Sequence, residues 1–112
     1  MEFDVHARKA TVPEEMRTQA VTKLSKLGKR APVLERARVR LAEDPEAPGA
    51  TRHVCDVTLE GHGHVLRAHA AASDLPVAVD LVVEKLEHQV ERLKGKLVGR
   101  SHPRKSRLLS EA

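Results

Sequence analysis

The sequence contains almost no aromatic residues: Phe3 is the only one, and there is no Trp and no Tyr. Modules that read single-stranded RNA or DNA usually stack the bases on exposed aromatic rings. A base-stacking module is therefore poorly supported. Any nucleic-acid partner would have to be held through its phosphate backbone and its shape.

Cysteine and long apolar runs are also scarce. The single cysteine, Cys55, cannot form an intramolecular disulfide, which agrees with a reducing compartment. No run approaches the roughly 18 apolar residues of a membrane-spanning helix. The N-terminal stretch MEFDVHARK lacks the apolar core of a signal peptide. We therefore expect a cytoplasmic protein with no membrane partner.

Motifs of catalysis are missing as well. The sequence has no glycine-rich phosphate loop, no nucleophile motif and no pair of carboxylates at a useful spacing. With 112 residues, the chain is long enough for one hydrophobic core and too short for two. We expect one domain that is not an enzyme and takes no cofactor and no small-molecule substrate.

The charges are unevenly distributed, although the net charge is only +4. Residues 8–40 hold ten basic and three acidic side chains, whereas residues 41–84 hold two basic and eight acidic ones. This asymmetry predicts a molecule with a positive side and a negative side. Residues 99–112 form a basic tail with little apolar periodicity, which we expect to be disordered in isolation.

Alternation of apolar and polar residues predicts four strands, at residues 2–7, 36–41, 52–60 and 64–71. Helical spacing of apolar residues predicts two helices, one after Pro13 and one from Asp74 to about Val98. Both kinds of element need one buried face. The expected fold is α+β, in the order β-α-β-β-β-α, with both helices on one face of a four-stranded sheet, similar to double-stranded-RNA-binding domains. This domain should span residues 1–98.

The second helix sorts its charges by sign. One stripe is apolar and comprises Val79, Val82, Leu86, Val90, Leu93 and Leu97. A second is acidic, with Asp80, Glu84, Glu87 and Glu91, and a third is basic, with Lys85, His88, Arg92 and Lys96. A helix that uses charge for local support would place Glu four residues before Lys. An unneutralised basic stripe instead suggests a negatively charged partner, although accidental segregation on a solvated face gives the same pattern.

The first helix also combines an apolar stripe with a basic face. Met16, Ala20, Leu24 and Leu27 recur at helical spacing. Lys23, Lys26 and Arg30 share another face, and Lys29 lies beside them. We expect the basic faces of the two helices to lie next to each other.

The stretch DLPVAVDLVVEKLEHQVERLKGKL, residues 74–97, resembles the closing helix of the ribosome hibernation promoting factor and ribosome-associated inhibitor A family. In that family an Asp-capped start leads through an aliphatic stripe to Lys-Leu-x-x-Gln-aliphatic, which here is Lys85, Leu86, Gln89 and Val90. The Lys-Leu-x-Lys-Leu run at residues 23–27 and the order of elements also agree. The resemblance covers residues 1–98 and identifies the chain as a short form or an isolated N-terminal domain.

The resemblance implies a function. A member of this family binds the small ribosomal subunit in the channel for messenger and transfer RNA, and blocks initiation by occupying it. Carried onto this sequence, it implies contact with ribosomal RNA through Lys23, Lys26, Lys29, Arg30, Lys85, His88, Gln89, Arg92 and Lys96. Long members carry a C-terminal dimerising domain. This sequence has only the basic tail in that place, so we do not expect it to dimerise ribosomes by itself.

Three alternatives stay open. A general double-stranded-RNA-binding module would need the same charge pattern, because it also recognises shape and phosphates. His53 and Cys55 on one strand, with His62 and His64 after it, could bind zinc, although a lone buried cysteine is more often a small hydrophobic residue. The outward face of residues 36–41, with Arg36, Arg38 and Arg40, is either a solvated surface or a second RNA surface.

Overall fold

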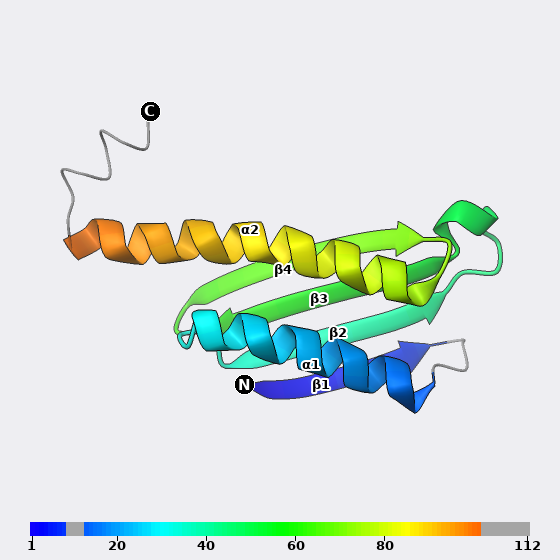
Figure 1. The fold of residues 1–112 in the computed structure, drawn as a ribbon, viewed down its shortest axis with the longest axis horizontal. Helices are drawn as coiled ribbons and strands as arrows, with labels where there is room; N and C mark the ends of the chain where they lie inside the picture. The colour runs from blue at the N-terminus through cyan, green and yellow to red at the C-terminus, as the bar shows by residue number, and fades with distance from the viewer. Residues whose placement is uncertain (9–12, 102–112) are drawn as a thin grey trace.

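The computed structural model describes the backbone of residues 1–8 and 13–101 and the side chains of residues 1–7 and 13–96. Figure 1 shows the elements, which follow one another as β1 (Glu2–Arg8), α1 (Glu14–Arg30), β2 (Arg36–Glu43), a short 3-10 turn η1 (Gly49–Thr51), β3 (His53–Gly61), β4 (His64–Ala72) and α2 (Leu75–Ser101). This is the predicted order, so the α+β fold class is confirmed.

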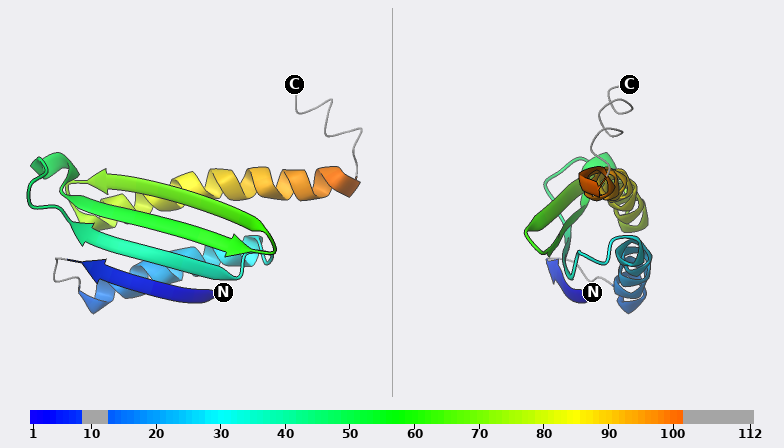
Figure 2. Two further views of the ribbon diagram at one scale, coloured as in Figure 1. Left: turned by 180° about the vertical axis from the view of Figure 1, so that it is seen from behind. Right: turned by 90° about the vertical axis from the view of Figure 1, so that its left-hand side faces the viewer.

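The four strands form one sheet in the order β1-β2-β3-β4. β1 pairs with β2 in parallel because α1 carries the chain back to the starting end, whereas β2, β3 and β4 form an antiparallel meander. Both helices cover the same face of this sheet, and the other face is open (Figure 2). β1 and β4 are therefore the edge strands.

The hydrophobic core lies between the helices and the sheet. The apolar stripe of α1 is buried as predicted, at Met16, Ala20, Leu24 and Leu27. Its counterpart on α2 is buried at Val79, Val82, Leu86, Val90 and Leu93, while Leu97 is outside the described side chains. The sheet contributes alternate residues of β2 and β3, namely Ala37, Val39, Leu41, Cys55, Val57 and Leu59, each no more than 1% exposed.

Local signals explain where the elements turn and begin. The β3–β4 hairpin turns at His62 and Gly63, which both have a positive φ, as a two-residue hairpin turn requires. Asp74 caps α2, because its Oδ1 accepts a hydrogen bond of 3.2 Å from the Val77 amide. The predicted end of α2 at Val98 was three residues early, since the helix continues to Ser101. The rest of the predicted tail, residues 102–112, is outside the described residues.

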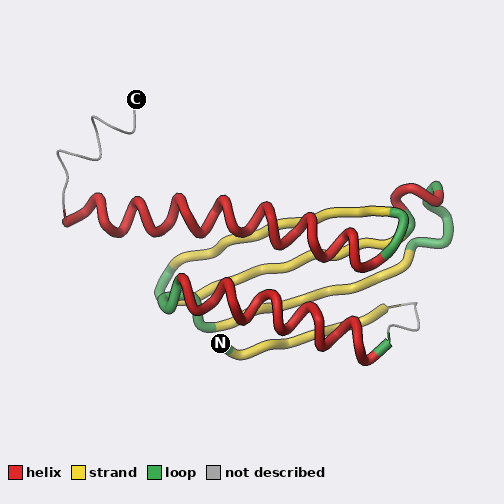
Figure 3. The backbone as a smooth tube through the Cα atoms, in the orientation of Figure 1, coloured by secondary structure: helices red, strands yellow, loops and turns green. Residues whose placement is uncertain are grey.

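The two helices run in the same direction, and α2 continues past the end of α1 and of the sheet (Figure 3). From Glu91, which contacts the last residue of α1, to Ser101 the helix rises by roughly 15 Å. In the described part of the chain, no helix is both long and apolar enough to cross a membrane.

Candidate nucleic-acid interface

The basic side chains of α1 fall into two groups. Lys23 and Arg30 point toward α2, where Lys23 forms an ion pair with Asp80 and Arg30 forms one with Glu91. Lys26 and Lys29 are exposed, and no ion pair involves them among the described side chains of residues 1–7 and 13–96. Lys26 and Lys29 are therefore the α1 cations that are most available to a partner.

The acidic stripe of α2 lies on the side that faces α1. Asp80 and Glu91, near its two ends, make the ion pairs with α1. The acidic stripe thus separates the basic residues of α1 from the basic stripe of α2. The prediction that the two basic faces lie next to each other was wrong, because the ion pairs between the helices turn the acids inward and the basic stripe to the opposite flank.

The basic stripe of α2 runs along β4, and two polar residues of this flank bind the backbone of that edge strand. The Gln89 side chain donates to the Arg67 carbonyl oxygen at 2.9 Å and accepts from the Arg67 amide at 3.3 Å. The Lys85 ammonium donates to the His69 carbonyl oxygen at 2.7 Å. Gln89 and Lys85 therefore satisfy backbone groups that an edge strand otherwise leaves to water.

Replacing Gln89 by Ala should reduce stability, because the mutation removes both hydrogen bonds to Arg67. We expect the free energy of unfolding to fall by about 1–2 kcal/mol, since water can reach the freed groups of an edge strand. Urea unfolding of the variant measures this change. His88→Ala is the matched control, because His88 immediately precedes Gln89 and its side chain is exposed. Equal stability of the two variants would contradict the structural role of Gln89.

The remaining basic residues lie at the end of the molecule where α1 ends, on different flanks of the two helices. Lys26 and Lys29 are exposed in the last two turns of α1, and Arg92 and Lys96 are exposed on α2 shortly after Glu91, which pairs with the last residue of α1. Lys94 is exposed in the same turns of α2 and joins this group. The distal basic cluster is defined here as Lys26, Lys29, Arg92, Lys94 and Lys96.

Sequence reasoning missed Lys94 because it lies seven residues after Glu87 and three after Glu91, on the acidic stripe. The positive charge of Lys94 within an acidic stripe was the feature that could have identified it. Cations in the last turns of a helix also favour the negative end of the helix dipole. Arg30 borders the cluster but is engaged with Glu91.

The residues considered for zinc do not come together. His53 begins β3 and His62 follows its end, so roughly 26 Å of strand separates them. Cys55 is buried in the core, and burial, with the charge of Asp56, raises the pKa of its thiol to about 12. Among the described residues, no group of three or more His, Cys, Asp or Glu side chains is placed to hold a metal ion.

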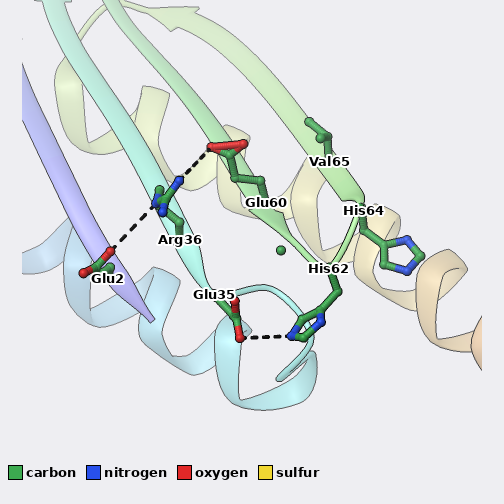
Figure 4. Close-up of a pocket in the computed structure, with 9 residues that line it drawn as sticks. Glu2, Glu35, Arg36, Glu60, His62, His64 and Val65 are labelled. Atoms are coloured by element: carbon green, nitrogen blue, oxygen red, sulfur yellow. Dashed lines mark hydrogen bonds and ion pairs between the residues drawn. The ribbon is translucent and has the colours of Figure 1, made fainter.

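A groove of about 570 Å³ lies beside the β3–β4 turn. Its charged side chains pair with one another, as Figure 4 shows: His62 contacts Glu35 at 3.0 Å, while Arg36 lies between Glu2 at 3.8 Å and Glu60 at 3.9 Å. The His64 ring points away from His62. Because these charges pair with one another, the groove does not extend the exposed positive surface of the distal basic cluster.

Comparison with known proteins identifies the family. The family model described as sigma 54 modulation protein / S30EA ribosomal protein matches residues 3–98. The chain belongs to this family. The family is ribosome-associated, which confirms the resemblance to ribosome hibernation factors and the expected link to translation. No curated protein gave a significant match to the sequence.

Two solved structures share the fold of this S30EA family member. The N-terminal domain of Protein Y from Thermus thermophilus is 24% identical, with a TM-score of 0.68, over 83% of this chain and 99% of that domain. A ribosomal subunit interface protein from Coxiella burnetii is 18% identical, with a TM-score of 0.72, over 84% of this chain and 98% of the other. At these identities the likeness concerns the fold.

In this family member, the Lys-Leu-x-x-Gln-aliphatic sequence has a visible structural role. Leu86 and Val90 are fully buried under the helix. Lys85 and Gln89, on the flank, bind the β4 backbone as described above. Contact of Lys85 and Gln89 with ribosomal RNA stays a prediction, and it would have to use the parts of these side chains that β4 leaves free.

The open face of the sheet carries balanced charge in this S30EA protein. Arg36, Arg38 and Arg40 are exposed there, as predicted. Glu60 contacts Arg38 at 3.3 Å, and Asp56 contacts Arg67 at 3.3 Å. In all, the described side chains of this face include four arginines and four acids: Arg36, Arg38, Arg40, Arg67, Glu2, Asp4, Asp56 and Glu60. This balance favours a solvated face over a second RNA surface.

Proposed function

We propose that this protein binds the small ribosomal subunit in the channel between its head and body and blocks translation initiation by occupying the place of messenger and transfer RNA. Membership of the S30EA family supports the ribosome as the partner. The observation that carries the mode of binding is the distal basic cluster, whose five cations are exposed at one end of the molecule.

Phosphate recognition suits this surface. Lys and Arg side chains hold the nucleic-acid backbone without reading sequence, and the chain has no Trp or Tyr with which to stack bases. Lys23 and Arg30, which are paired but remain more than a third exposed, can add to the field of the cluster. His88 is an exposed neighbour on the same helix. The protein acts by occupancy, with no chemical step, in the cytoplasm where ribosomes work.

Sedimentation with purified small subunits tests this function. The protein should move with vacant subunits through sucrose at low salt, and binding should weaken on the order of a thousandfold between roughly 50 and 200 mM salt if six or more phosphates are contacted. An initiation-stalled complex, whose channel is filled, should not bind it. Free protein at the top of the gradient at both salt concentrations would contradict the proposal.

A competing RNA duplex separates this function from general duplex binding. If the chain recognises a ribosomal site, an excess of plain duplex should leave most of the protein on the subunit. If the duplex removes the protein in proportion to its phosphate concentration, the chain is a double-stranded-RNA-binding module without preference for ribosomes.

A further inference from the structure

The two edge strands of the sheet differ in how far their outward backbone groups are hydrogen-bonded. Along β4, side chains of α2 bind the backbone of Arg67 and His69, so this edge is partly occupied. Along the outer edge of β1, no strand pairs and no hydrogen bond is formed within the described part of the chain. β1 lies at the margin of the sheet in both views of Figure 2. The sheet can therefore be extended most readily at β1.

The backbone groups that face this free edge can be named. The Glu2 amide donates to the Glu35 carbonyl oxygen at 2.8 Å, so the backbone of Glu2 faces β2. Alternate residues of a strand present their backbone to the same side. The N–H and C=O groups of Phe3, Val5 and Ala7 consequently point outward, which leaves three donors and three acceptors on one edge.

The sequence of β1 is complementary to itself when it is reversed about Val5. It reads acid, apolar, acid, apolar, base, apolar, base from Glu2 to Arg8. In an antiparallel pair of two copies with Val5 opposite Val5, Asp4 lies opposite His6 and Phe3 opposite Ala7. Every outward donor then meets an outward acceptor, because Phe3, Val5 and Ala7 occupy hydrogen-bonded positions. Shifting the register to place Asp4 opposite Asp4 would oppose like charges.

We propose that a second copy of this chain docks on β1, in this register, to form a continuous eight-stranded sheet with a two-fold axis at Val5. The burial of β1 supports this surface. Phe3, Val5 and Ala7 are only half-buried, whereas their partners Ala37, Val39 and Leu41 on β2 are fully buried. Pairing covers the remaining apolar surface, and since the two-fold axis is perpendicular to the sheet, the helices of both copies lie on the same side.

Charge variants of the full chain test the pairing without ribosomes, so that the outcome is independent of the proposed function. In sedimentation velocity, the natural chain should show a monomer–dimer equilibrium at concentrations up to about 100 µM, as expected for a small interface. Asp4→Lys should weaken it by about tenfold or more, because in both symmetry-related pairs it replaces the carboxylate that accepts a hydrogen bond from the opposite His6 ring by an ammonium group. Adding His6→Glu to Asp4→Lys reverses both pairs and should restore association.

Val65→Lys is the control, because it also adds a positive charge but lies on β4, where Val65 is 62% exposed. It should associate like the natural chain. Dimers that tolerate Asp4→Lys, or a double variant that stays as weak as Asp4→Lys, would overturn the register. A chain that stays monomeric at every concentration would overturn the proposal, and the edge would then be open to a strand from another protein.

A cysteine at the axis provides a second measurement that does not depend on charge. Residues directly opposite in a hydrogen-bonded pair have Cα atoms about 5.5 Å apart, which suits a disulfide. Val5→Cys should therefore form covalent dimers in a glutathione buffer faster than Val65→Cys, although Val65 is the more exposed position. Equal rates would contradict pairing at Val5. The natural Cys55 does not interfere because it is buried.

Discussion

Replacing Lys26 and Arg92 together by Glu should abolish binding to the small ribosomal subunit while leaving the circular dichroism spectrum unchanged. Both side chains are exposed in the distal basic cluster, one on each helix, so neither contributes to the core. Under the proposed function, reversal removes two phosphate contacts and adds repulsion. We expect the affinity to fall at least about a hundredfold at low salt.

The matched control is the double variant Arg38→Glu, Arg40→Glu. It changes the net charge by the same amount but on the open face of the sheet, where Arg38 and Arg40 are exposed. Binding should stay within a few-fold of the natural chain. If this control loses binding as strongly as the first variant, the RNA surface lies on the sheet and the assignment to the helices fails.

Neutral substitutions give a finer measurement, because binding remains detectable. In Lys26→Gln, Arg92→Gln, the slope of log affinity against log salt should decrease by about two, one unit for each phosphate contact removed. A decreased affinity with an unchanged slope would mean that the two residues act through the fold and not through phosphates.

Gly61→Ala should be the most destabilising small substitution at a described glycine. A Cβ atom at this position would lie 2.2 Å from the Val33 carbonyl oxygen and 2.6 Å from the Glu35 amide nitrogen. These are backbone atoms, and Glu35 is fixed by its hydrogen bond of 2.9 Å to Glu60, so the loop cannot move aside cheaply. We expect a loss of about 3 kcal/mol or more and a decrease in Tm of roughly 10–20 °C.

Gly49→Ala separates this steric effect from the general effect of replacing glycine. No atom lies within 4 Å of a Cβ at Gly49. Its Tm should stay within about 3 °C of the natural value or increase slightly, because alanine restricts the unfolded chain. Thermal unfolding by circular dichroism measures both variants. A stable Gly61→Ala would show that the path of residues 33–35 over the end of β3 can change.

Much of the fold followed from the sequence because periodicity reports burial directly. The alternation at residues 36–41 specified which side of β2 faces the core, and the spacing from Met16 to Leu27 did the same for α1. The strand order, with β1 parallel to β2 at one edge, was not predicted. Alternation identifies the buried face of a strand and contains no information on its neighbours.

The candidate site was less predictable for a physical reason. The charge stripes of α2 were visible in the sequence, but their direction depends on which flank α1 occupies, and that is a tertiary property. Asp80 and Glu91 form ion pairs with residues of α1. The Gln89 side chain is hydrogen-bonded to the β4 backbone. A helical wheel shows that these residues share flanks, and only the packed structure shows what each flank meets.

The common direction of the two helices also has an electrical consequence. Glu14 and Glu15 lie in the first turn of α1, and Lys29 and Arg30 lie in its last turn; α2 runs in the same direction (Figure 1). α1 alone spans roughly 25 Å, which exceeds the Debye length of about 10 Å at 0.1 M salt. The charged side chains of α1 therefore form an electric dipole along this helix, and under the proposed function a polyanion would exert a torque that presents its basic end first. This alignment before contact accelerates association, and the acceleration declines as salt is added.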